Sequence, residues 1–125
     1  MNARQVFLLI AGIGLVPIAL AYGVVPQKSL GYCLDISLSN TNSIHIFRAA
    51  MGLYLALSLF WILAAFKVHL RQAALYSLIV FMLGLAAGRI LSLLIDGIPH
   101  WLLLVYLVLE LGFGAVGLVL ANKSD

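Results

Sequence analysis

Long runs of mostly apolar residues dominate this sequence. Four such runs cover residues 6–25, 44–66, 73–95 and 98–121. Each is about 20 residues or longer, enough for a helix rising about 1.5 Å per residue to cross the hydrocarbon core of a bilayer. The pattern predicts an all-α integral membrane protein, in which residues 1–125 form a single four-helix bundle.

The segments between the runs are short and contain residues that end helices. The longest, residues 26–43, is rich in Pro, Gly, Ser and Asn, and we expect it to be an outer loop. A basic turn containing Lys67 and Arg71 separates the second and third runs, and Gly97 and Pro99 separate the third and fourth. The sequence therefore leaves no room for a large extramembrane domain.

The first run has a second interpretation as a secretory signal. Arg4 precedes an apolar stretch that contains Ala19 and Ala21, and this order is typical of a signal and its cleavage site. The apolar run nevertheless continues to Val25, with Tyr22 inside it. We favour a membrane-spanning helix, and the sequence alone leaves open whether this helix is ever cleaved.

The distribution of basic residues predicts the orientation in the membrane. Four spans place both termini on the same side of the membrane. That side also contains Arg4, Lys67, Arg71 and Lys123, whereas the loops on the opposite side contain only one Lys or Arg, Lys28. Because basic residues concentrate on the cytoplasmic side of a membrane, we predict that both termini lie in the cytoplasm.

The composition supports the membrane interpretation and excludes several other classes. Hydrophobic residues make up 65% of the chain and charged residues 9%, against about half and about a quarter in a typical soluble domain. The net charge is +3, but the sequence has no basic face of the kind that nucleic-acid binding requires, and this class of function is therefore excluded. The single cysteine, Cys33, excludes an internal disulfide, and the histidines and carboxylates lack metal-ligand spacing. We therefore predict no cofactor and no metal.

Charged residues inside the apolar runs are the main functional clue. At 1.5 Å per residue, Arg48 lies about 6 Å and Arg89 about 9 Å below the outer ends of their predicted helices. Glu110, about ten residues into the fourth helix, lies near the middle of the bilayer. Because a charge in hydrocarbon costs on the order of 3 kcal/mol, these side chains are expected to meet one another, a ligand or a partner.

Several alternatives stay open for these residues. Arg48 can snorkel to the outer headgroups, and Asp96 can simply flank a loop. Glu110 is too short to snorkel, so it is either protonated or paired with Arg89 or Arg48. Such a pair is either structural, joining helices, or part of a ligand or proton site. The predicted ligand or ion-pair cluster comprises Arg48, Arg89, Glu110, Asp96, His45 and Tyr106.

The same charged residues lie in three short motifs. They are Arg48-Ala49 followed by Gly52, Gly88-Arg89 followed by Asp96-Gly97, and an acidic residue, Glu110, in the last helix. Over most of the chain this pattern resembles a bacterial family of small membrane proteins called domain of unknown function 4345. The resemblance implies a four-helix membrane protein and supplies no activity. With the predicted topology, it places the chain in the bacterial inner (cytoplasmic) membrane.

The sequence predicts a protein that is not an enzyme, because it contains no nucleophile elbow, phosphate loop or dinucleotide fingerprint. We expect a binding or accessory module whose Arg/Glu cluster holds an anionic or amphipathic small molecule or a membrane lipid. One alternative is a proton-coupled small-molecule carrier, acting as a homodimer, that uses Glu110. Another is a small subunit of a larger membrane complex.

Overall fold

The computed structural model of this chain describes residues 2–34 and 40–123. Within these residues the chain forms five helices and no strand: α1 (Ala3–Gly23), α2 (Pro26–Cys33), α3 (Thr41–Phe66), α4 (Val68–Ile95) and α5 (Trp101–Ala121). All except α2 are long and apolar enough to cross a membrane. The prediction of an all-α, four-helix membrane protein is confirmed, and the protein is a multi-pass membrane protein.

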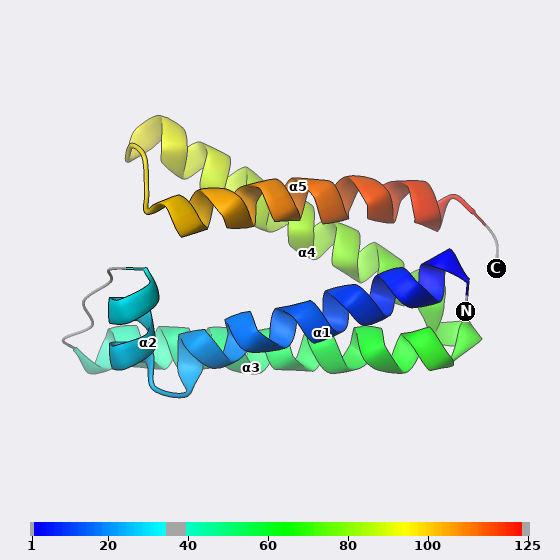
Figure 1. The fold of residues 1–125 in the computed structure, drawn as a ribbon, viewed down its shortest axis with the longest axis horizontal. Helices are drawn as coiled ribbons and strands as arrows, with labels where there is room; N and C mark the ends of the chain where they lie inside the picture. The colour runs from blue at the N-terminus through cyan, green and yellow to red at the C-terminus, as the bar shows by residue number, and fades with distance from the viewer. Residues whose placement is uncertain (1, 35–39, 124–125) are drawn as a thin grey trace.

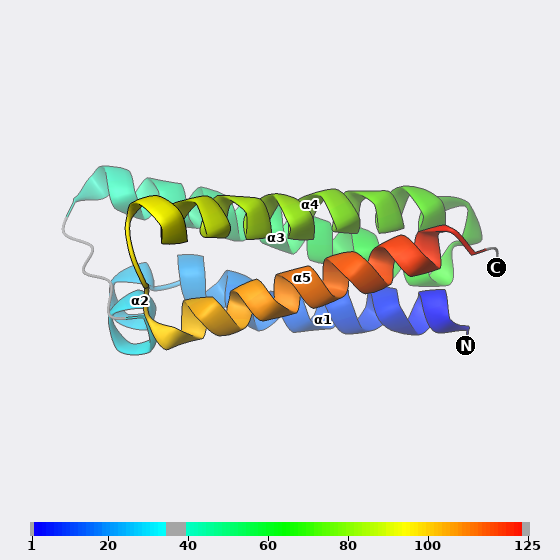
Figure 2. The same cartoon turned by 90° about the horizontal axis from the view of Figure 1, so that it is seen from above.

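The four long helices pack as two antiparallel pairs. Helix α1 lies along α3, and α4 lies along α5, so that the pairs form two layers (Figure 1). Seen from above, α5 lies over α1 and α4 lies over α3 (Figure 2). Both chain ends lie at one end of the bundle, which we call the terminal end. The two layers are close there and diverge toward the opposite end (Figure 1).

The prediction of a loop over residues 26–43 is wrong for its first part, because Pro26–Cys33 forms α2. Pro26 occupies the first turn, where its fixed φ suits a helix and its missing N–H is not needed. Leu30 and Leu34 are almost fully buried, so packing against the bundle holds this largely polar helix in place. Residues 35–39 of the predicted loop lie outside the described residues.

The observed helix boundaries differ by several residues from the predicted ones, because capping groups determine where each helix begins and ends. Asn40 accepts a hydrogen bond from the Ser43 amide at 2.8 Å, so α3 begins earlier than residue 44. Lys67 alone, with an extended backbone, separates α3 from α4. The His100 ring accepts a hydrogen bond from the Leu102 amide at 3.2 Å, and α5 therefore begins after residue 98.

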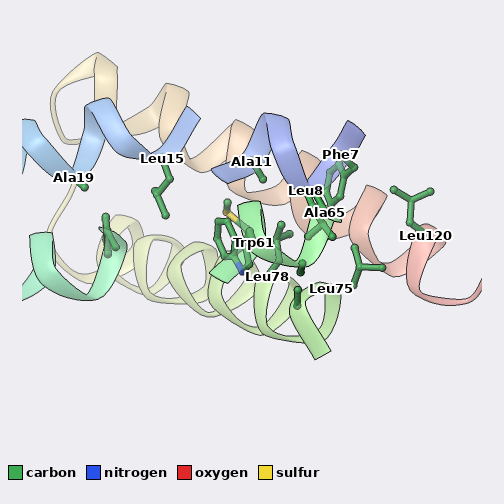
Figure 3. Packing of buried hydrophobic residues seen from close by; sticks show 14 of the residues in the cluster. Phe7, Leu8, Ala11, Leu15, Ala19, Trp61, Ala65, Leu75, Leu78 and Leu120 are labelled. Carbon is green, nitrogen blue, oxygen red and sulfur yellow. The ribbon is translucent and has the colours of Figure 1, made fainter. Parts of the chain in front are cut away.

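The hydrophobic core is largest where the four helices meet nearer the terminal end (Figure 3). Trp61 on α3 is fully buried, and its indole N–H donates to Ser77 Oγ on α4 at 3.0 Å. Leu8, Leu75 and Leu78 are also fully buried in this core. The buried indole and its polar partner join the two layers.

Two glycines allow α5 to lie close to α4. A Cβ atom at Gly114 would lie 2.5 Å from Leu83 Cδ2, and one at Gly117 would lie 3.0 Å from Ile79 Cγ1. A larger side chain at either position would require these neighbours to move, and such small residues are typical of close membrane helix packing. These contacts bring the Glu110 face of α5 against α4.

Two buried arginines fix the terminal end. Arg4 Nη1 donates to the Lys123 carbonyl oxygen at 2.8 Å, and Arg4 Nη2 donates to Gln72 Oε1. Arg71 Nη2 donates to the Ala65 carbonyl oxygen at 2.9 Å. These carbonyl groups lie at or just beyond the C-terminal ends of α3 and α5, where backbone oxygens lack helical partners and the helix dipole is negative. We call Arg4 and Arg71, together with the groups to which they donate hydrogen bonds, the terminal network.

The terminal network places both chain ends at the same end of the bundle. Gln72 Nε2 also donates to the Ala121 carbonyl oxygen, and Gln5 Nε2 to that of Ala65, both at 2.9 Å. Side chains of α1 and α4 thereby hold the ends of α3 and α5. This arrangement agrees with the sequence-based topology, in which the basic side faces the cytoplasm. That orientation stays a prediction.

Candidate functional site

Arg89 on α4 and Glu110 on α5 form an ion pair inside the bundle. Arg89 Nε donates to Glu110 Oε1 at 2.9 Å and to Oε2 at 3.1 Å. The Glu110 side chain is 8% exposed and that of Arg89 23%. The chain reverses between α4 and α5 at Gly97, whose φ of 98° suits glycine, and the two helices then run antiparallel. Residues on either side of this turn can therefore meet at the same depth.

Tyrosines from three helices surround the ion pair. The Tyr106 ring, one turn before Glu110, lies 5.7 Å from Arg89 Cζ, within the range of a cation–π interaction. Tyr22 on α1 lines the same cavity as Arg89. The ring of Tyr54 on α3 lies 5.6 Å from that of Tyr22. All four membrane-spanning helices thus contribute to one polar cluster, which we call the Arg89 site.

A cavity of about 130 Å³ adjoins the Arg89 site, and we call it the inner cavity. All four long helices line it, and most of its lining is apolar. Its polar or aromatic lining residues are Tyr22, Tyr54, Phe81, Arg89, Tyr106, Glu110 and Phe113. The ion pair therefore has a hydrophobic space beside it rather than a packed core.

The inner cavity reaches the lipid-facing surface between α1 and α5. Ile10 and Gly14 on α1 and Leu109 on α5 line it, and all three are exposed. Toward the terminal end the Phe7 and Phe113 rings close the gap between these helices, with centroids 5.4 Å apart. In a membrane, this geometry makes the opening face the acyl chains.

A second cavity of about 360 Å³ lies between α4 and α5 at their connected ends. Its lining includes Gly84, Gly88, Ser92 and Pro99. Arg89 lines both cavities, as does the neighbouring Leu85. Arg89 therefore stands between the inner cavity and this outer cavity.

The structure brings together three of the six residues in the predicted cluster, namely Arg89, Glu110 and Tyr106. Arg48 and His45 are exposed, and neither lines the two cavities described above. They lie one turn apart on one side of α3, away from the face that contains the buried Tyr54. The predicted meeting of Arg48 with Glu110 is therefore not observed.

Asp96 is also outside the Arg89 site. It is exposed at the end of α4, where its carboxylate accepts a hydrogen bond from Ser92 Oγ at 2.7 Å. This contact matches the alternative in which Asp96 flanks a turn. Tyr22 and Tyr54, which the sequence did not indicate, belong to the Arg89 site instead. The helical phase of Tyr54 relative to Trp61, seven residues on, is the signal that could have identified it.

Within residues 2–34 and 40–123, no group of three or more His, Cys, Asp or Glu side chains could hold a metal ion. A family model described as "Domain of unknown function (DUF4345)" matches residues 3–121. The chain belongs to this family. The match includes every helix of the DUF4345 fold described above. No curated protein and no solved structure matches the chain. The function of this DUF4345 protein must therefore be argued from its site.

Proposed function

We propose that this DUF4345 protein is a non-enzymatic binding module for an amphipathic small molecule in the bacterial inner membrane, with both termini in the cytoplasm. The observation that carries the proposal is a guanidinium group, that of Arg89, in the wall of an apolar cavity that opens toward lipid. Charged side chains are rare inside membrane helices, and most of them pair with another group or line a pathway or a binding site.

The chemistry of Arg89 supports binding of a polar head. Glu110 engages the Nε of Arg89. The guanidinium group has four more N–H donors, on Nη1 and Nη2, and these can bind the polar head of a guest. Because hydrogen bonds to a charged donor are stronger in a dry site, an acceptor in the inner cavity gains both affinity and orientation.

The opening of the cavity supports an apolar tail. The exposed Ile10 and Leu109, which lie on either side of the opening, are 56% and 46% exposed. Small-molecule sites combine mostly apolar walls with a few placed polar groups, and the inner cavity has this combination. A guest can enter sideways from the bilayer and leave its tail among the acyl chains.

The charge balance favours an uncharged head over an anionic one. Glu110 neutralises Arg89, and Arg48, the second arginine of the predicted cluster, is exposed on α3. A carboxylate guest would compete with Glu110 for the same guanidinium group. An anionic guest would require two arginines near Glu110, so that one positive charge is left over. Because only one arginine lies at the site, this reason for an anionic guest no longer holds.

A cavity-filling variant tests the proposal without touching the ion pair. A Cβ at Gly14, which lines the cavity, would meet nothing within 4 Å, so Gly14→Phe is expected to fold and to fill the opening. Gly52→Phe is the matched control, because Gly52 on α3 is exposed and has the same open surroundings. Native mass spectrometry of protein gently extracted from its membrane should show a bound mass in wild type and Gly52→Phe. Gly14→Phe should lack this mass, and its retention in this variant would refute the proposal.

One observation favours a second candidate, a proton-coupled carrier. Arg89, which is paired with Glu110, lies between the inner cavity and the outer cavity, so a change in the protonation of Glu110 would act at the boundary between the two. This candidate predicts proton-linked flux in proteoliposomes that Glu110→Gln abolishes. Flux that continues in this variant would exclude Glu110 as the coupling group. The role of a subunit in a larger complex stays a sequence-based prediction.

A further inference from the structure

The inner cavity restricts the chemical class of the guest, and this inference rests on the function proposed above. Its volume is about 130 Å³. An apolar cavity of about 150 Å³ in another protein holds one benzene molecule. The inner cavity is therefore of about the size that holds a single six-membered ring, and a tail can extend through the opening.

Aromatic side chains form much of the wall of this ring-sized space. Tyr22, Tyr54, Phe81, Tyr106 and Phe113 reach it from four helices. The Tyr54 and Phe81 rings meet edge to face, with centroids 5.2 Å apart. Aromatic side chains favour flat guests, because rings pack in stacked or edge-to-face arrangements. The shape of the wall thus favours a planar ring over a branched or flexible head.

The polar part of the wall offers hydrogen-bond donors more than acceptors. Both carboxylate oxygens of Glu110 already accept from Arg89. The guanidinium group has donors only. A matching head therefore carries acceptor oxygens and no charge, and ring carbonyl groups meet both conditions.

We infer that the inner cavity binds the head of an alkylated benzoquinone, or a molecule of the same shape with one flat ring, carbonyl acceptors and an apolar tail. A ring carbonyl accepts hydrogen bonds from Arg89. The ring packs among the tyrosines and phenylalanines. The tail leaves between α1 and α5, past Gly14.

Four probes with the same tail separate these features. Decyl-benzoquinone has one ring and acceptors, decylbenzene has the ring alone, decyl-naphthoquinone has two fused rings, and decanoate has a charged acceptor without a ring. Calorimetric titration of the full chain in detergent gives the affinity of each. We expect decyl-benzoquinone to bind about tenfold or more tighter than the other three, the factor that about 1.4 kcal/mol corresponds to.

Variants show which group recognises the probe. Arg89→Gln should weaken decyl-benzoquinone about tenfold and leave decylbenzene unchanged, a difference that a purely structural role would not produce. Gly14→Phe should weaken all probes, and Gly52→Phe should weaken none. If Arg89→Gln does not fold, the order in which the wild-type protein binds the four probes still decides the chemical class of the guest.

Failure of this inference can be told apart from failure of the proposed function. Suppose that decanoate or decyl-naphthoquinone binds most tightly and that Gly14→Phe weakens its binding. This result would overturn the benzoquinone class and leave the binding function intact. Equal affinity of all four probes, again lost in Gly14→Phe, would also overturn it, because recognition would then be by the tail alone. Binding of every probe that is unaffected by Gly14→Phe would overturn both.

Discussion

Two regions of this membrane protein hold arginines inside the bundle, where Arg4 and Arg71 are buried and Arg89 is partly exposed, and the arginines have different partners in the two regions. In the terminal network, Arg4 and Arg71 donate to backbone carbonyl oxygens at the ends of α3 and α5, within packed structure. At the Arg89 site, the guanidinium group pairs with a carboxylate and lines two cavities. A buried arginine therefore does not by itself indicate a binding site. The space beside it and the partners it already has decide between a structural role and a functional one.

The largest effect should come from removing an arginine of the terminal network. Arg71→Ala removes one charged donor from each of the Ala64 and Ala65 carbonyl oxygens, which keep the Lys67 amide and Gln5 Nε2 as their remaining donors. We expect the free energy of unfolding to fall by about 3 kcal/mol, since the variant loses two buried hydrogen bonds from a charged group, each of which contributes about 1.5–3 kcal/mol. Unfolding in mixed micelles measures this change.

His69→Ala is the control for this variant, because His69 is exposed two residues earlier on the same helix. Its stability should match that of wild type. Folded Arg71→Ala should still bind guest as wild type does. Loss of guest without loss of stability would mean that the terminal network, rather than the Arg89 site, is the binding region.

A smaller effect is expected from removing one charge of the Arg89–Glu110 pair. Glu110→Gln leaves the guanidinium group without its counter-charge, and we expect a loss of roughly 2 kcal/mol, below the range for fully buried pairs because Arg89 is partly exposed. The unbalanced Arg89 should also prefer an anion. Relative to wild type, the affinity ratio of decanoate to decyl-benzoquinone should rise.

Asp96→Asn provides the comparison, since Asp96 is an exposed carboxylate near the end of the same helix as Arg89. It should change neither the stability nor the affinity ratio in the same titrations. An unchanged ratio in Glu110→Gln would show that Glu110 does not control the charge preference of the cavity.

The smallest change in stability is expected when both charges are replaced together. Arg89→Met with Glu110→Met substitutes apolar side chains of similar length for the pair. Such replacements of buried pairs are often neutral or stabilising, so the unfolding free energy should stay within about 1 kcal/mol of wild type. The guest should nevertheless be lost, as native mass spectrometry would show. A large loss of stability with the guest retained would assign the pair to structure, like the terminal network.

The apolar runs predicted most of the fold, because run length alone identifies a helix that can cross a bilayer. They did not predict α2, which is short and mostly polar and is held by the burial of Leu30 and Leu34. Such burial depends on neighbouring helices that a local pattern does not contain. The observed first residues of α3 and α5 differ from the predicted ones, because the caps at Asn40 and His100 depend on backbone geometry.

The sequence predicted which charged residues could meet, but it did not predict how each helix is rotated about its axis. Arg89 and Glu110 were identified because charges are rare in apolar helices, and the structure pairs them. Arg48 has a similar depth, but its side of α3 faces outward. Tyr22 and Tyr54 line the cavity beside Arg89 from the other layer of the bundle. Only the packing of the two layers reveals that contribution.

The most direct test is a crystal structure of the protein purified from its own membrane and grown in a lipid phase without added ligand. We predict density for a ring-sized head in the inner cavity, with an acceptor atom within hydrogen-bond distance of Arg89 Nη1 or Nη2. A tail should continue between Gly14 and Leu109. An inner cavity filled by the protein's own side chains, with Arg89 bonded only within the chain, would contradict a binding role for the Arg89 site.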